Sequence, residues 1–454
     1  MARAASKRTT VLYPNALPGS LAAKRPHVDN GDGTISGERY YRRDIFEAEW
    51  DRIWTRTWHL AGPLCDLKAP GDFFTYDFMH ESFLVVMQPD RSVRAFYNVC
   101  PHRGNRLVYA DNGSLPEFSC IYHGWKFATD GDRRSIKDPE SFEGIDTSRG
   151  ACLSKVACEV HAGLVWINMD GDAGPVKEAL GLPDGLLESY RLDEMVTVSR
   201  QVQEVIGNWK LALENVTEAY HFDVVHEPFR LPDFSNPMAA QIDLHPNGAS
   251  SWFIPFGQPS SKIDQEEINE ALRGFLKVSG IDPDRFEGSA QDVRPAVQRL
   301  KRDHAVKAGF DVSGFIDGQF TDTWGVSMFP ATLIAMNFEV VLLQRLQPHP
   351  RDPERYFMTP IVLYRPGSVS GTGLPPFLSV PGMDLDPKSI PPTRRYSLQD
   401  GFQLGPLIQE DVDIIEKTLL GVKSRGYKGP IWGEQEQRLR HFHKEYDRYM
   451  EGGK

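Results

Sequence analysis

The sequence predicts an α+β protein, with a small all-β domain followed by a larger domain that combines a sheet and a long helix. Two observations carry this prediction. Apolar or alternating runs of strand length occur in both halves of the chain. Near the C-terminus, apolar residues recur at helical spacing over residues 404–419. The expected strands are residues 82–87, 93–99, 163–169, 194–206, 333–347 and 356–364.

A polar, glycine-rich stretch at residues 170–175 separates the two halves. We therefore expect an N-terminal arm at residues 1–44 with helices that pack on the larger domain, a β domain at 45–168 and the larger domain at 169–454. The chain has 454 residues, of which 40% are hydrophobic. That length is sufficient for two hydrophobic cores.

Composition excludes several classes of protein. A net charge of −11 argues against nucleic acid as a partner, because binding phosphates needs a basic surface. No apolar run is long enough to span a bilayer. Cys65, Cys152 and Cys158 are few and odd in number, which predicts buried thiols in a reducing compartment rather than a disulfide framework.

Two short motifs in the β domain combine cysteine with histidine. They are Cys100-Pro-His102 and Cys120-Ile-Tyr-His123. Two irons bridged by two sulfides need four protein ligands in two pairs, and each motif offers one thiolate and one imidazole. A structural zinc site is the alternative, but such sites usually separate both ligand pairs by two or more residues. A single proline separates the first pair here, which favours an iron–sulfur cluster.

A second candidate metal site lies about a hundred residues later, around His221 and His226. Two histidines and a carboxylate can hold a mononuclear iron and leave positions open for dioxygen and substrate. On an ideal helix, residues five apart point about 140° away from each other. We therefore expect the helix to be distorted or to end between these histidines.

Together these motifs resemble the oxygenase α subunit of the Rieske non-heme iron oxygenases, the aromatic-ring-hydroxylating dioxygenase family. The resemblance rests on Cys100-Pro-His-Arg-Gly, Cys120-Ile-Tyr-His-Gly-Trp and the His221/His226 pair, and it spans roughly residues 40–450. It implies a Rieske 2Fe–2S cluster on Cys100, His102, Cys120 and His123. It also implies a helix-grip (START-like) catalytic domain, with an antiparallel sheet around a long C-terminal helix.

In that family the third iron ligand is an aspartate on a late helix, followed five residues later by a glutamate. Asp411 and Glu416 match this pattern. Asp411 shares its expected helix face with Ile408 and Ile415, and a carboxylate on an apolar face needs a cation as partner. The alternative is that Asp411 belongs to a solvated acidic run.

Two further residues near His221 are candidate catalytic residues, Glu218 and Asn215. The family usually has an aspartate three residues before the first histidine, where it bridges to a cluster histidine of the neighbouring subunit. Glu218 stands there in this chain. In this respect the chain resembles enzymes that oxidise quaternary ammonium compounds such as carnitine; a neutral replacement is the alternative.

The substrate pocket is less well defined by the sequence. Val224 and Asn215 lie within one or two turns of the iron histidines and are candidate pocket residues. Phe315, Phe320 and Phe338 could wall the cavity, although aromatic residues of a sheet are more often core.

The resemblance implies a terminal oxygenase component in the bacterial cytoplasm. NAD(P)H electrons would arrive from a ferredoxin and/or flavin reductase, which must be another protein because no nucleotide-binding motif occurs here. The assembly would be a homotrimer, or α3β3 with a small β subunit. The expected reaction is ring dihydroxylation of a small aromatic substrate. Alternatives are a monooxygenase or N-demethylase acting on N-methyl or quaternary ammonium compounds, and a non-catalytic electron-transfer or zinc-binding protein.

Overall fold

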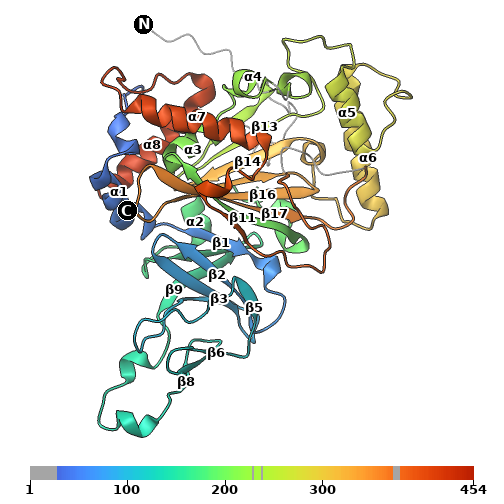
Figure 1. The fold of residues 1–454 in the computed structure, drawn as a ribbon. Helices are drawn as coiled ribbons and strands as arrows, with labels where there is room; N and C mark the ends of the chain where they lie inside the picture. The colour runs from blue at the N-terminus through green and yellow to red at the C-terminus, as the bar shows by residue number, and fades with distance from the viewer. Residues whose placement is uncertain (1–27, 228–229, 237–238, 372–378, 454) are drawn as a thin grey trace.

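The computed structural model describes residues 28–227, 230–236, 239–371 and 379–453. The chain forms a narrow lobe of strands below a larger lobe in which helices surround a sheet (Figure 1). This arrangement confirms the predicted fold class. Residues 1–27 of the expected N-terminal arm lie outside the described residues.

The lower lobe is built on a seven-stranded sheet with the order β1-β10-β9-β4-β3-β2-β5, and a three-stranded sheet, β6-β7-β8, follows β5 in the chain. The runs predicted at residues 82–87, 93–99 and 163–169 form β3, β4 and β10. The strands are β1 (His59–Pro63), β2 (Asp72–Phe78), β3 (Glu81–Met87), β4 (Val93–Tyr97), β5 (Asn112–Ser114), β6 (Glu117–Ser119), β7 (Lys126–Ala128), β8 (Arg133–Ser135), β9 (Lys155–His161) and β10 (Leu164–Asn168).

The upper lobe contains an eight-stranded sheet with the order β12-β13-β14-β15-β16-β17-β11-β18. Its neighbours pair antiparallel except β11 and β18, which are parallel. The strands are β11 (Val196–Ile206), β12 (Gln241–Leu244), β13 (Ser250–Ile254), β14 (Thr323–Met328), β15 (Thr332–Met336), β16 (Val340–Pro348), β17 (Arg355–Tyr364) and β18 (Arg394–Tyr396).

One strand prediction needs correction. Residues 333–347 form two strands, β15 and β16, rather than one. A tight turn separates them, in which the Asn337 side chain accepts a hydrogen bond from the Glu339 N–H at 2.8 Å. Apolar residues continue on both sides of this turn, so the hydrophobic pattern does not reveal it.

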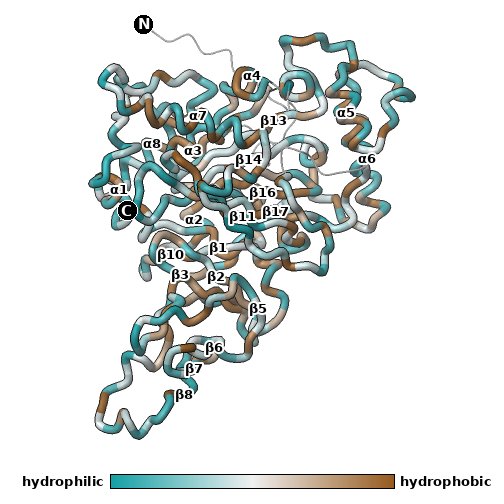
Figure 2. Tube along the Cα trace, viewed as in Figure 1, coloured by the Kyte–Doolittle hydropathy of each residue, from teal (hydrophilic) through white to brown (hydrophobic). Residues whose placement is uncertain are grey.

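Helices cover the upper sheet, as Figure 1 shows for α3, α7 and α8 on one side and α5 and α6 on the other. The predicted late helix is α7; it begins at Pro406, a residue suited to the first helical position, and it buries Ile415 and Leu419. Hydrophobic residues follow the central strands, whereas hydrophilic residues dominate many peripheral loops (Figure 2). The helices are α1 (Arg43–Glu49), α2 (Val176–Leu180), α3 (Trp209–Val216), α4 (Phe222–Val225), α5 (Glu270–Ser279), α6 (Ala290–Lys307), α7 (Pro406–Val422) and α8 (Gln437–Met450).

None of the described helices combines the length and apolar character needed to cross a membrane. All five cysteines are free thiols. Cys65 and Cys158 are partly buried, but Cys152 is exposed, so the prediction of three buried thiols is wrong for Cys152. Cys152 lies outside the named strands, where it forms an isolated β-bridge with Asp132.

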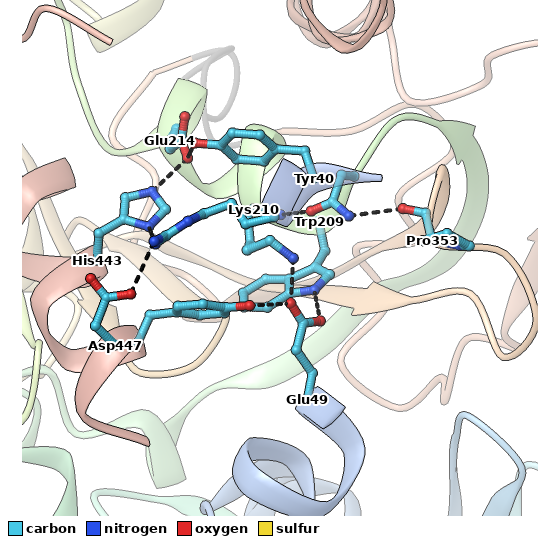
Figure 3. A network of polar contacts seen from close by, with 11 residues as sticks. Tyr40, Glu49, Trp209, Lys210, Glu214, Pro353, His443 and Asp447 are labelled. Atoms are coloured by element: carbon cyan, nitrogen blue, oxygen red, sulfur yellow. Dashed lines mark hydrogen bonds and ion pairs between the residues drawn. The ribbon is translucent and has the colours of Figure 1, made fainter. Parts of the chain in front are cut away.

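A buried ion pair joins the N-terminal helices to α3 and α8 (Figure 3). Lys210 Nζ lies 2.5 Å from Glu49 Oε1, and both side chains are almost fully buried. Trp209 Nε1 and the Tyr446 hydroxyl also donate to the Glu49 carboxylate, at 3.1 and 2.6 Å. The network fixes the first turn of α3, the helix that leads to the candidate iron histidines.

A second part of this network reaches the middle of α3. Arg39 donates to His443 Nδ1 at 2.7 Å, so the proton of the neutral imidazole is on Nε2. His443 Nε2 then donates to Glu214 at 2.7 Å, and the Tyr40 hydroxyl donates to the same oxygen. Residues far apart in the sequence therefore hold α3 from two sides.

We expect Glu49→Ala to lower the free energy of unfolding by about 3–5 kcal/mol, because it leaves the buried Lys210 charge without a partner. Denaturant unfolding measures the change. Glu47→Ala is the matched control, since Glu47 is exposed on the same helix. Equal effects of the two substitutions would contradict this account of the network.

Candidate metal centres

The two cysteine motifs form loops with the same hydrogen bonds. The Cys100 N–H donates to the Asn105 carbonyl at 2.8 Å, and the Cys120 N–H donates to the Trp125 carbonyl at the same distance. Both cysteine side chains are buried, and Asn105 Nδ2 lies 3.8 Å from Cys120 Sγ. Two matching loops therefore bring two thiols together.

A glycine closes each loop. Gly104 has a φ of 75° and Gly124 a φ of 69°, in the left-handed region that favours glycine. Their N–H groups donate to the carbonyls of Cys100 and Cys120, at 3.0 and 2.9 Å. The conformation of each turn, rather than a lack of space for a side chain, explains the glycine.

The two histidines of these motifs lie beside each other, with ring centroids 4.5 Å apart. The Trp125 ring stacks on His102 at 4.7 Å, with an interplanar angle of 3°. His102 Nδ1 is buried and has no hydrogen-bond partner among the described residues. Burial raises the pKa of the Cys100 thiol to about 11, so its thiolate needs a cation nearby. These residues fit a cluster with two thiolate and two imidazole ligands.

The candidate iron histidines flank the single turn of α4. Helix α3 ends at Val216, five residues before His221, and α4 ends just before His226. The chain is therefore not one continuous helix through this region, as the spacing of the two histidines predicts. The interruption lets both imidazoles face α7.

Asp411, on α7, completes a three-residue cluster with His221 and His226. One potential ligand atom from each residue lies within 4.8 Å of the others. Asp411 Oδ1 is 3.4 Å from His221 Nε2 and 3.1 Å from His226 Nε2. This oxygen is buried and has no hydrogen-bond partner among the described residues. A set of two imidazoles and one carboxylate fits iron(II).

Two glutamates orient the imidazoles. Glu218 Oε1 lies 2.5 Å from His221 Nδ1, and Glu410 Oε2 lies 2.9 Å from His226 Nδ1. When Nδ1 donates to a carboxylate, Nε2 is left as the metal ligand. Sequence reasoning placed Glu410 only among the acidic residues next to Asp411 and missed this role. Its pairing with a histidine 184 residues away has no local sequence signal.

The charges of the triad are strongly coupled. Burial disfavours a charged imidazole, but the nearby Asp411 and Glu218 carboxylates outweigh it and raise the pKa of His221 to about 9. Burial likewise opposes the charge on His226, whose pKa is raised by Asp411 and Glu410. Burial would raise the pKa of Asp411, but the two histidines lower it. A divalent cation can take the place of these protons, so metal binding here would release protons.

Arg438, on α8, supports the loop before the iron histidines. It is buried and donates to the Thr217 carbonyl at 2.8 Å and to Ser250 Oγ at 2.7 Å. Its guanidinium also lies 5.0 Å from the Trp252 ring centroid, a cation–π contact. Because Thr217 directly precedes Glu218, Arg438 fixes the start of the loop that carries Glu218. The sequence contains no signal for this contact.

The triad opens onto an apolar cavity of about 180 Å³, which we call the iron compartment. Phe222, Trp252 and Phe256 line it together with aliphatic residues of β14, β15 and β16. Of the described residues that line it, only the triad members are ionisable. The aliphatic and small lining residues are Val216, Leu231, Ile254, Gly325, Val326, Leu333, Ile334, Ala335, Leu342, Leu407 and Ile408.

The predicted pocket residues lie elsewhere. Val224 is 79% exposed on α4, because it points away from the sheet. Phe315, Phe320 and Phe338 are buried against one another in the hydrophobic core, with Phe338 ring centroids 5.0 and 4.7 Å from the other two. Asn215 is partly buried next to the cavity-lining Val216, and its Oδ1 has no hydrogen-bond partner among the described residues.

The two candidate centres lie at opposite ends of the folded molecule. The cluster loops adjoin β4 and β6 in the lower lobe, whereas α4 and α7 lie at the top of the upper lobe (Figure 1). The surface at the cluster is partly apolar, since Ile121 and Tyr122 are 75% and 53% exposed beside His123.

Two family models match the chain. Residues 57–147 match the Rieske 2Fe–2S domain, and residues 192–452 match the catalytic domain of the ring hydroxylating alpha subunit. The second match covers more than half of the chain, and its range contains the histidine and aspartate triad. The first contains both cysteine motifs.

Two similar proteins illustrate the range of the relatives. The carnitine monooxygenase oxygenase subunit of Escherichia coli (strain K12) is 30% identical over 253 residues, covering 53% of this chain and 64% of that protein. The benzene 1,2-dioxygenase subunit alpha of Pseudomonas putida is 32% identical over 199 residues, covering 42% of this chain and 44% of that protein. The matched regions thus span less than two thirds of either relative.

A solved structure of naphthalene 1,2-dioxygenase with indole bound in the active site has the same fold. Its TM-score is 0.64 at 18% sequence identity, over 93% of both chains. The chain therefore belongs to the family of ring-hydroxylating alpha subunits, which combine a Rieske 2Fe–2S domain with a catalytic domain that binds mononuclear iron.

Proposed function

We propose that this chain is the terminal oxygenase component of a multicomponent system, and that it hydroxylates a small, apolar aromatic substrate. The observation that carries the proposal is the His221, His226 and Asp411 triad at the wall of an apolar compartment. Family membership supports an oxidoreductase with two metal centres in one chain.

The geometry supports one set of residues for each cofactor. Cys100, His102, Cys120 and His123 would hold the 2Fe–2S cluster. His221, His226 and Asp411 would hold the mononuclear iron, and two carboxylates would keep Nε2 of both histidines directed at it. When bound, the iron supplies the activation of dioxygen. The protein excludes water and orients the substrate in the apolar compartment.

Electrons would come from NAD(P)H through a separate ferredoxin and/or flavin reductase and enter at the cluster. We propose that they pass from His123 of one subunit through Glu218 to His221 of a neighbour, in a head-to-tail trimer. The two centres lie at opposite ends of the folded molecule, which supports electron transfer between subunits. The contact between Glu218 and His221 supports the last step within a subunit. Three cysteines remain outside the proposed cluster and form no disulfide, which fits a reducing compartment such as the bacterial cytoplasm.

The lining of the iron compartment favours an aromatic substrate. Its volume of about 180 Å³ is similar to that of an engineered apolar cavity of about 150 Å³ that binds benzene. A carboxylate such as that of carnitine would find no Lys or Arg among the described lining residues. Burying such a charge without a partner is unfavourable. We therefore propose ring hydroxylation, with dihydroxylation as the expected outcome.

A quaternary ammonium substrate is the second candidate. Phe222, Trp252 and Phe256 could receive a trimethylammonium group through cation–π contacts. The similarity to a carnitine monooxygenase subunit, and a glutamate rather than an aspartate at position 218, also support this candidate. It would make the chain a monooxygenase or N-demethylase.

Turnover with a surrogate ferredoxin and reductase distinguishes these candidates. We expect kcat/KM to be at least about tenfold higher for benzene than for glycine betaine, because no lysine or arginine is among the described residues that line the iron compartment. Mass spectrometry after reaction under ¹⁸O₂ should find two labelled oxygens in the ring product. Oxidation of glycine betaine alone would favour the second candidate, and oxygen consumption without any organic product would contradict both.

A further inference from the structure

A second cavity adjoins the iron compartment. It has a volume of about 630 Å³ and lies between α5, the N-terminal end of α7 and the start of β16; we call it the outer compartment. Its lining is mainly apolar and includes Phe234, Phe275 and Val380. A ligand pocket for an organic molecule usually measures about 300–1,000 Å³, so the iron compartment alone is smaller than this range and the outer one lies within it.

The two compartments share part of their walls. Four aliphatic side chains line both cavities, so one layer of side chains lies between them. Aliphatic side chains change rotamer without breaking a hydrogen bond, and they offer an apolar passage from one cavity to the other. The four shared residues are Leu231, Leu342, Leu407 and Ile408.

Helix α5 contributes both large and small side chains to the wall of the outer compartment. Ala271 and Gly274 lie one turn apart and both line the outer compartment. Glycine in a helix is less favourable than alanine, yet a Cβ atom built on Gly274 would meet no atom within 4 Å. Gly274 is also solvent-exposed, so the compartment reaches the surface beside α5. A side chain at position 274 would narrow the compartment where it opens.

The outer compartment has one charged pair in its wall. Lys301 Nζ lies 2.6 Å from Glu339 Oε2, and these side chains are 7% and 2% exposed. They are the only ionisable residues among the described residues that line this cavity. The ammonium group has further protons to donate, and the carboxylate has further acceptor sites. The pair can therefore hydrogen-bond a polar group on a ligand while it stays neutral overall.

We propose that the substrate occupies both compartments. It would be an elongated, mainly apolar molecule that places one ring beside the iron, extends a second ring or aliphatic portion under α5, and carries a hydroxyl or carbonyl group near Lys301 and Glu339. This inference rests on the proposed function, and it adds the size and the polarity of the substrate.

Binding of 4-hydroxybiphenyl tests the outer compartment without any turnover. We expect Gly274→Leu to raise the Kd in equilibrium dialysis at least about tenfold, because Gly274 lines the outer compartment and an added side chain there leaves less room for the second ring. Lys277→Leu is the matched control: it adds the same side chain to α5 at an exposed position that does not line the cavity, and it should leave the Kd unchanged. An unchanged Kd in Gly274→Leu would overturn the inference.

Turnover of the same variants separates this inference from the proposed function. Benzene fits within the iron compartment, so Gly274→Leu should lower kcat/KM for 4-hydroxybiphenyl by a larger factor than kcat/KM for benzene, whereas Lys277→Leu should change neither. If Gly274→Leu weakens binding of 4-hydroxybiphenyl but no arene is oxidised, the inference about the outer compartment is supported and the proposed function is contradicted. If benzene is oxidised and both variants bind 4-hydroxybiphenyl like the wild type, the proposed function is supported and the inference about the outer compartment is contradicted.

The polar end of the substrate has its own test. The double substitution Lys301→Met and Glu339→Leu removes both charges and leaves neither without its partner. Proteins often tolerate such a replacement of a buried ion pair. The wild type should bind 4-hydroxybiphenyl about threefold to tenfold more tightly than biphenyl. The double variant should still bind biphenyl but lose this preference. A preference that persists in the double variant would place the hydroxyl group elsewhere.

Discussion

Asp411→Ala is expected to remove the mononuclear iron and to lower turnover by more than about a hundredfold. The substitution deletes the only carboxylate of the triad, and even residues that merely orient a metal ligand contribute about ten- to a hundredfold. The visible spectrum of the cluster should not change, because the Rieske loops lie in the other lobe. Metal analysis, the spectrum and oxygen consumption measure the three effects.

The neighbours of Asp411 on α7 are its controls. Glu410→Ala should weaken iron binding by less than Asp411→Ala, because Glu410 contacts His226 Nδ1 and orients this ligand. Asp413→Ala should have no effect, since Asp413 is exposed and its side chain accepts only from Gln409. Iron retained in Asp411→Ala but lost in either control would move the ligand to that residue.

Glu218→Gln is expected to keep both metals and to slow reoxidation of the reduced cluster by at least about tenfold. One oxygen of Glu218 contacts His221 Nδ1, and the other accepts from the Tyr220 and His221 N–H groups. The amide keeps the size of the side chain but removes the charge that would couple the two histidines across the subunit boundary. Rapid mixing with substrate and dioxygen measures the rate.

Glu218→Asp is the matched control because it keeps the charge and shortens the side chain by one methylene. It should slow reoxidation less than Glu218→Gln. A rate in Glu218→Gln equal to that of the wild type would show that electrons follow another route. A loss of mononuclear iron in Glu218→Gln would instead indicate that Glu218 only positions His221.

The candidate ligand sets could be proposed from the sequence because most of their members are residue types at short spacing. Cys100 and His102, like Cys120 and His123, lie on one tight turn, so the motif already contains its local geometry. The fold class could also be predicted, because strand and helix patterns are local features of the sequence. Asp411 needed the resemblance as well, since α7 meets α4 only in the folded chain.

The residues around the centres were harder to predict because their contacts are distant in sequence. Glu410 and Arg438 act on residues about two hundred positions earlier, and neither contact changes the local pattern. The phenylalanines predicted to line the cavity lie in the core instead, for a related reason. Apolar patterns show that Phe315 and Phe338 are buried, but they do not distinguish a core position from a cavity wall.

Metal and sulfide content of the purified protein tests the central claim most directly. Two complete and separate ligand sets predict a red-brown protein with about three irons and two acid-labile sulfides per chain. Cys120→Ala should then lose the sulfide and two of these irons, while the mononuclear iron stays on the triad. A colourless protein that takes up zinc but neither iron nor sulfide would contradict the assignment of both centres.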